Sequence, residues 1–248
     1  MSNRKGFFES RNPVMKEKAY MQASQENALT GGATMTVQGA INKSFILGLI
    51  MLATAAFAFT APSQLFLWGG AIGGLVVVLI MSFRPAMSPI LAPIYAGLEG
   101  LFVGAVSAIY ASMLDGIIFQ AVSLTMGVFF TMLFIFKSRI IKVDNKLRVG
   151  VMMATGAVAL VYVVAIVMSM FGVTMPYLHQ AGPIGIGISL VIIAIASMNL
   201  LLDFDNFEKG EMYRAPAYME WFSAVGLLVT LVWLYLEILR LLSMLSRN

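Results

Sequence analysis

The chain has 248 residues, of which 60% are hydrophobic and 11% are charged, and its formal net charge is +4. A soluble domain has about 45–50% apolar and about 25% charged residues, so the surplus apolar surface needs lipid as its solvent. Cysteine is absent and His179 is the single histidine, which excludes disulfides, thiolate metal sites and a multi-histidine metal centre within one chain.

Residues 1–38 are polar and mixed in charge, and they predict a flexible tail that ends in a Thr30-Gly31-Gly32-Ala33 joint. Residues 39–248 form one domain, because the loops between their apolar blocks are short. Each block is close to the roughly 20 apolar residues that a membrane-spanning helix needs. The sequence therefore predicts an all-α, seven-helix transmembrane bundle with helices near 44–60, 65–82, 89–113, 116–136, 149–171, 182–202 and 217–245.

Basic residues lie almost entirely on one side of the implied membrane. Fourteen of the sixteen precede the first block or lie between blocks two and three, four and five, or six and seven. The alternate loops contain none, and this asymmetry places the N-terminus in the cytoplasm and the C-terminus outside. The orientation of the chain in the membrane explains the positive charge, so the lipid bilayer is the expected partner and nucleic acid is not.

Glycines four residues apart occur in the second and third blocks. Gly70 and Gly74 share one helix face, as do Gly100 and Gly104. Small residues at this spacing let a neighbouring helix approach closely, so we expect tight packing within the bundle.

Glu99 lies in the middle of the third block, where an ionised carboxylate is costly. Two interpretations stay open for it: a hydrogen-bonded packing residue, or a residue that lines an ion path.

Asp203 and Asp205 end the sixth block. We expect Asp205 to face cytoplasmic water near Lys209. Asp203 is two residues nearer the membrane, and we expect it to be buried.

Two more acids lie in the seventh block. Glu220 is near its start, where it can cap the positive end of the helix dipole. Glu237 follows sixteen apolar or weakly polar residues, and Arg240 lies three positions later on the same face. The spacing predicts a Glu237–Arg240 ion pair whose face points into the bundle, because the pair remains costly in lipid.

Buried carboxylates that converge cannot all be ionised, so such a site holds a proton at lower pH. Once deprotonated, their hard oxygens suit Ca²⁺. We therefore predict a cation path gated by protonation, with Arg84 at the end of helix two as a latch for a carboxylate. Enzyme activity is not expected: the membrane helices carry no Gly-x-Gly-Asp sequence, the chain has no phosphate-binding loop, and His179 falls in an outer loop as a solvated residue.

The chain resembles the transmembrane Bax-inhibitor-motif proteins, in particular their bacterial YccA-like branch. The matching segments are 201–205 (LLDFD), 234–242 (LYLEILRLL) and 95–100 (YAGLEG). The resemblance implies a central last helix and a pH-sensitive Ca²⁺ leak channel in the bacterial inner membrane. It assigns the proton-sensitive gate and transient Ca²⁺ binding to Asp203 and Glu237, the latch to Arg84, and no tightly bound cofactor.

Two alternatives remain open. If helix seven begins near 217, Glu220 lies level with Asp203, so simple geometry favours Glu220 as its partner whereas the motif favours Glu237. The resemblance also allows a second role, an interaction protein that modulates a membrane protease and contacts it through residues 1–38.

Overall fold

The computed structural model describes residues 32–172 and 182–246. Residues 1–31 of the predicted tail, and His179 with the loop around it, lie outside the described residues. The described part forms seven α-helices, each long and apolar enough to cross a membrane, which confirms the predicted fold class. They are α2 (Val37–Thr60), α3 (Gln64–Phe83), α4 (Ser88–Ala111), α5 (Ile117–Lys137), α6 (Asn145–Met170), α7 (Pro183–Met212) and α8 (Tyr218–Leu245), with a short 3₁₀ turn, η1 (Pro85–Met87), before α4.

Short polar side chains begin three of the helices. Thr36, Ser63 and Asp144 each accept a hydrogen bond from the backbone N–H three residues later, at the starts of α2, α3 and α6. Such N-caps satisfy amide donors that have no partner inside the helix. They fix where the chain enters each span.

Helix α7 differs most from the prediction. It continues to Met212, ten residues beyond the predicted end at 202, so Asp203 and Asp205 lie within the helix and the expectation that they end it is wrong. In this part of the helix Asp203 is bonded to α8 and Asp205 to α6, and Lys209 lies beside Asp205, which is one turn earlier.

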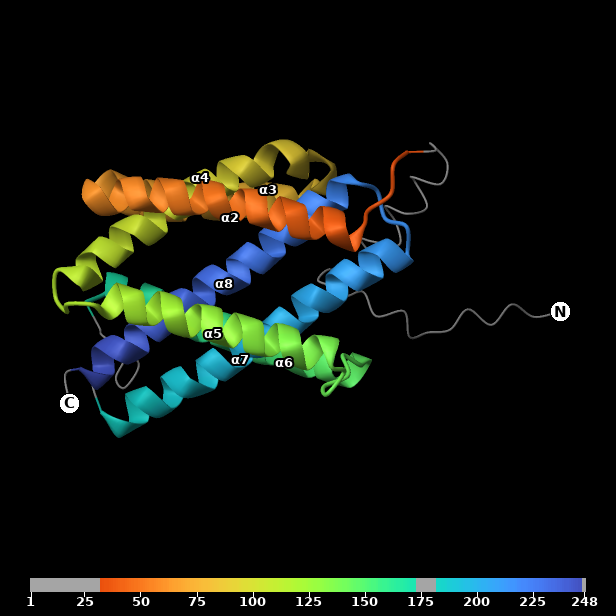
Figure 1. The fold of residues 1–248 in the computed structure, drawn as a ribbon. Helices are drawn as coiled ribbons and strands as arrows, with labels where there is room; N and C mark the ends of the chain where they lie inside the picture. Colours follow the sequence, from red (N-terminus) through yellow and green to blue (C-terminus); the bar gives the residue numbers. More distant parts are fainter. Residues whose placement is uncertain (1–31, 173–181, 247–248) are drawn as a thin grey trace.

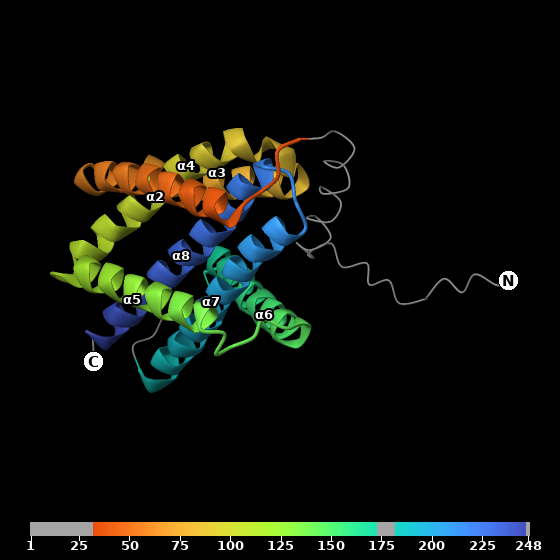
Figure 2. The same cartoon turned by 45° about the vertical axis from the view of Figure 1, so that its right-hand side comes forward.

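The other six helices form two groups around α8. Helices α2, α3 and α4 pack on one side of it, and α5, α6 and α7 lie on the other (Figures 1 and 2). Helix α8 runs obliquely between the groups and is the most buried of the seven. The expectation of a central last helix is therefore confirmed.

Close contact between α2 and α4 depends on glycine. A Cβ atom on Gly104 would lie 2.2 Å from the carbonyl oxygen of Ala55, and one on Gly100 would lie 2.4 Å from that of Met51. Both obstacles are backbone atoms, so the helices themselves would have to separate. The glycine spacing correctly predicted this packing.

We expect Gly104→Ala to lower the stability of the bundle by about 1–3 kcal/mol, the usual cost of overpacking. Gly97→Ala is the matched control, because a Cβ on Gly97, also in α4, meets nothing within 4 Å. Thermal unfolding in detergent compares the two. Equal midpoints would contradict the packing argument.

Candidate functional site

Four of the predicted acids are buried, and all four lie on α7 and α8. Asp203, Asp205, Glu220 and Glu237 are each less than 9% exposed. Charge inside a membrane protein is costly unless it is paired or hydrogen-bonded, so the partners of each acid define the site.

Asp205 is held between α6 and its own helix. Arg148 of α6 forms an ion pair with its carboxylate, and the Lys209 Nζ lies 3.3 Å from its Oδ2. Arg148 also donates a 3.1 Å hydrogen bond to the Asn206 Oδ1. The predicted proximity to Lys209 is confirmed, whereas the expectation that Asp205 faces water is wrong, because Arg148 covers it and only 7% of Asp205 is exposed.

Asp203 faces α8. The hydroxyl of Thr230 donates a 2.6 Å hydrogen bond to its Oδ2. Thr230 lies seven residues before Glu237 and ten after Glu220, which is about 10 Å and about 15 Å along the helix axis at 1.5 Å per residue. The geometric expectation that Glu220 lies level with Asp203 is therefore wrong, because α7 runs on past Asp203 before the chain turns into α8.

Glu237 lies at the centre of a network that joins three helices. It forms the predicted ion pair with Arg240. Tyr162 of α6 donates a 2.7 Å hydrogen bond to its Oε2, and Ser189 of α7 donates a 3.0 Å bond to its Oε1. Arg240 donates a 2.6 Å bond to the same Tyr162 hydroxyl. The face points into the bundle, as expected.

Glu220 lies in the first turn of α8, but its carboxylate binds the start of α2. The Thr36 backbone N–H and hydroxyl donate bonds of 3.0 and 3.1 Å to its Oε1. The Lys43 Nζ lies 3.8 Å from its Oε2. Glu220 thus links α8, the helix that carries it, to the start of α2.

Glu99 and Arg84 lie apart from these groups. Glu99 is half-buried in α4 with its carboxylate against Gly74 of α3, so close that a Cβ on Gly74 would lie 2.7 Å from the Oε2. Arg84 is exposed at the end of α3. Within residues 32–172 and 182–246, neither side chain forms a hydrogen bond or an ion pair that would join it to the acids of α7 and α8.

Polar side chains of α7 contact α6 or α8 at separate levels between residues 189 and 205. We use the term polar row for its side chains Ser189, Asn199, Asp203 and Asp205 together with their partners on α6 and α8. Besides the contacts above, the Asn199 amide donates a 2.7 Å bond to the Thr155 hydroxyl of α6. From residue 189 to residue 205 the row extends about 24 Å along the helix, most of the roughly 30 Å hydrocarbon thickness.

Several members of the row were not among the sequence-predicted residues. Arg148 lies in the α6 helix, although the sequence placed it in a loop with four other basic residues. Tyr162, Ser189 and Thr230 carry neutral side chains that are common in membrane helices, so nothing in the sequence marked them.

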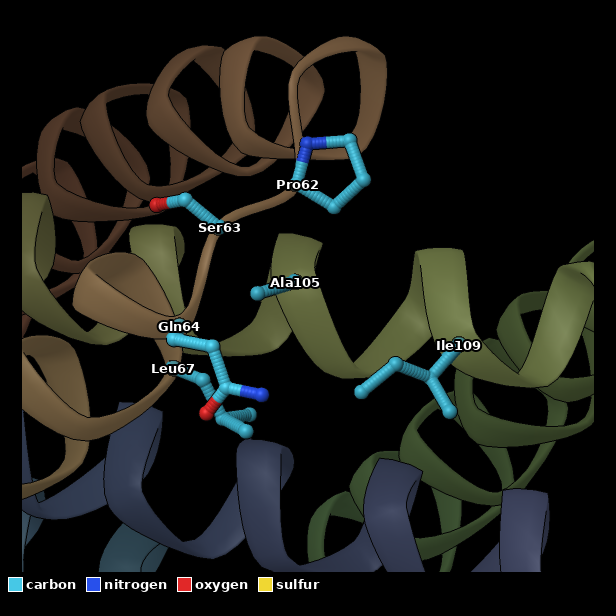
Figure 3. A pocket seen from close by; sticks show the side chains of 6 residues that line it. All are labelled: Pro62, Ser63, Gln64, Leu67, Ala105 and Ile109. Carbon is cyan, nitrogen blue, oxygen red and sulfur yellow. The ribbon is translucent and has the colours of Figure 1, made fainter.

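A small pocket lies elsewhere in the bundle, between the α2–α3 turn and α4 (Figure 3). Its lining contains no carboxylate and no basic residue: Pro62, Ser63, Gln64, Leu67, Ala105 and Ile109. In the part of the chain that the structure describes, no group of three or more acidic or histidine side chains is close enough to hold a metal ion. The buried acidic side chains are therefore spread along α7 and α8 and do not line a single pocket.

The seven apolar spans of the described residues enclose buried, hydrogen-bonded or paired charges, and together they define a multi-pass helical membrane protein. The chain belongs to the Bax inhibitor 1-like family, whose model matches residues 12–247, so the predicted resemblance is confirmed at the level of the family. Comparison with curated proteins found no significant match, and comparison with solved structures found none either.

Proposed function

We propose that the protein is a cation leak channel, with Ca²⁺ as the preferred ion, whose flux depends on the protonation of carboxylates buried along α7 and α8. The polar row is the observation that carries the proposal. Apolar spans need no such residues to fold, and each buried charge is costly in lipid. A series of oxygen ligands along one helix gives a hard cation successive places to shed its water.

In the arrangement described above, the row is closed by the protein's own cations and hydroxyl groups. Arg148 and Lys209 neutralise Asp205 near the end where α7 stops, and Arg240 neutralises Glu237 near the opposite end. A permeating ion has to compete with these donors for the same oxygens. Arg148 and Arg240 therefore take the latching role that the sequence assigned to Arg84.

We place the end that carries Lys43, Arg148 and Lys209 on the cytoplasmic side of a bacterial inner membrane. The distribution of basic residues supports this orientation, since cytoplasmic loops carry an excess of lysine and arginine.

Ca²⁺ flux into proteoliposomes tests the proposal. We expect the flux to rise as the pH increases from acidic to neutral, because a deprotonated carboxylate attracts the ion and a protonated one does not. Asp203→Asn keeps an acceptor for Thr230 but removes the charge, and it should lower the flux at neutral pH at least about tenfold and weaken the pH dependence.

Asp144→Asn is the matched control. Asp144 is exposed and caps α6, and asparagine is an equally good N-cap, so both folding and flux should be unchanged. Absence of flux from the wild-type protein at every pH, or an unaltered profile in Asp203→Asn, would sink the proposal.

A further inference from the structure

The two helix groups on either side of α8 are joined at one end of the bundle by a short extended segment. Residues 33–37, just before and at the start of α2, lie against residues 215–217, which connect α7 to α8. The Met35 N–H donates a 2.6 Å bond to the Ala215 carbonyl, and the Ala217 N–H donates a 2.9 Å bond to that of Ala33. Thr34 and Pro216 form an antiparallel bridge between these bonds.

Two carboxylates reinforce this backbone pairing. Glu220 of α8 accepts both the N–H and the hydroxyl of Thr36. Glu211 of α7 accepts a 3.3 Å bond from the N–H of Val37. Thr36 already caps α2 through Gly39, so local capping does not require either acid. We call residues 33–37, their partners 215–217, Glu211 and Glu220 the clasp.

The seat of Glu220 exists because residue 39 is glycine. A Cβ on Gly39 would lie 1.9 Å from the Glu220 Oε1 and 2.2 Å from its Cδ. An alanine there would displace the carboxylate, even though alanine is otherwise the better residue in a helix. At position 39, α2 thus has glycine, a weak helix former, where the Glu220 carboxylate packs against the helix.

The position of the clasp gives it a mechanical role. Helix α2 packs extensively against α4 and α8 but makes little contact with α7. The clasp is where α2 is bonded directly to both α7 and α8, the two helices that carry the polar row. Movement of α7 relative to α2 therefore has to break it.

We propose that the clasp is a closure that holds α7 and α8 against α2 and thereby restrains the polar row. The inference deepens the proposed channel function, and only its flux readout rests on that function. Residues 1–31 connect to the bundle through this segment, so a ligand or protein that pulls on them acts on the clasp first.

Gly39→Ala displaces the Glu220 carboxylate from the clasp without removing a charge. Gly48→Ala is its control, because Gly48 lies in the same helix and a Cβ there meets nothing within 4 Å. Hydrogen exchange of residues 33–38 in the full-length protein should rise about tenfold in Gly39→Ala, the size expected from losing a hydrogen bond to a charged group, and should stay unchanged in Gly48→Ala.

The reverse experiment locks the clasp. The chain contains no cysteine, so Thr34→Cys with Pro216→Cys introduces a single pair. Residues facing each other across an antiparallel bridge are within the Cα separation that a disulfide needs. Oxidation should lower Ca²⁺ flux at least threefold and reduction should restore it, whereas Gly39→Ala should raise flux by a similar factor.

A third measurement keeps the clasp testable if the protein passes no Ca²⁺. Spin labels at Asn42→Cys and Met212→Cys, both exposed positions, report the distance between α2 and α7. Added to the glycine variants, they should show a longer and broader distance in Gly39→Ala than in Gly48→Ala. Unchanged exchange and unchanged distance in Gly39→Ala overturn the clasp, while absent flux with altered distance overturns only the channel.

Discussion

Arg148→Leu should be among the most destabilising single substitutions in this chain. It leaves the Asp205 carboxylate buried, with Lys209 at 3.3 Å as its remaining basic neighbour. Removing one member of a buried ion pair costs about 3–5 kcal/mol, because the other charge stays desolvated. We expect the midpoint of thermal unfolding in detergent to fall by on the order of 10 °C.

Two further variants separate the effect of leaving a charge buried without its partner from the general effect of losing an arginine. Arg139→Leu removes an exposed pair with Glu208, which lies 2.7 Å away, and should cost no more than about 1 kcal/mol. Arg148→Leu combined with Asp205→Leu should recover most of the loss, since apolar residues often replace a buried pair without penalty. The Arg148 Nε, buried and without a hydrogen-bond partner in the described residues, adds to that expectation. A double variant as unstable as Arg148→Leu alone would contradict the argument.

The seven spans could be predicted because span length and apolarity are properties of a single segment. The Glu237–Arg240 pair could be predicted for the same reason, since three-residue spacing on one helix brings the two side chains together. Gly100 and Gly104 also follow this rule, because their spacing alone marks a face that lets α2 approach.

The partners of Asp203 and Asp205 depend instead on how far α7 is shifted relative to α6 and α8. The sequence placed the end of the sixth helix at its first charged residues. The ten further residues of α7 change which residues of α8 lie at the same height as Asp203 and Asp205. Thr230 is therefore opposite Asp203, and Glu220 lies beside Thr36. Pairing between helices is a tertiary property that no local pattern contains.

Roles for residues 1–31 stay predictions, among them contact with a membrane protease. Since residues 33–37 are bonded to the α7–α8 connection, a deletion that tests such contact should end at residue 31. A longer deletion would also remove the Thr36 cap of α2 and so mix two effects.

Arg240→Leu should have an effect as large as Arg148→Leu, at the other end of the polar row. Glu237 is 3% exposed and would keep only the hydroxyl groups of Tyr162 and Ser189 as donors among the contacts described above. Two neutral hydrogen bonds do not replace a cation beside a buried carboxylate, so we expect a loss of about 3–5 kcal/mol in detergent unfolding. Tyr162→Phe removes the hydroxyl that Arg240 and Glu237 share and should cost about 1.5–3 kcal/mol.

Arg84→Leu is the matched control for Arg240→Leu, because it makes the same substitution at an exposed arginine. It should shift stability by less than about 0.5 kcal/mol. Ca²⁺ flux also decides which arginine closes the path. It should be higher in Arg240→Leu combined with Glu237→Gln than in Glu237→Gln alone, and it should stay at the wild-type level in Arg84→Leu. The opposite pattern, a flux change only in Arg84→Leu, would return the latch to helix α3 and remove Arg240 from the mechanism.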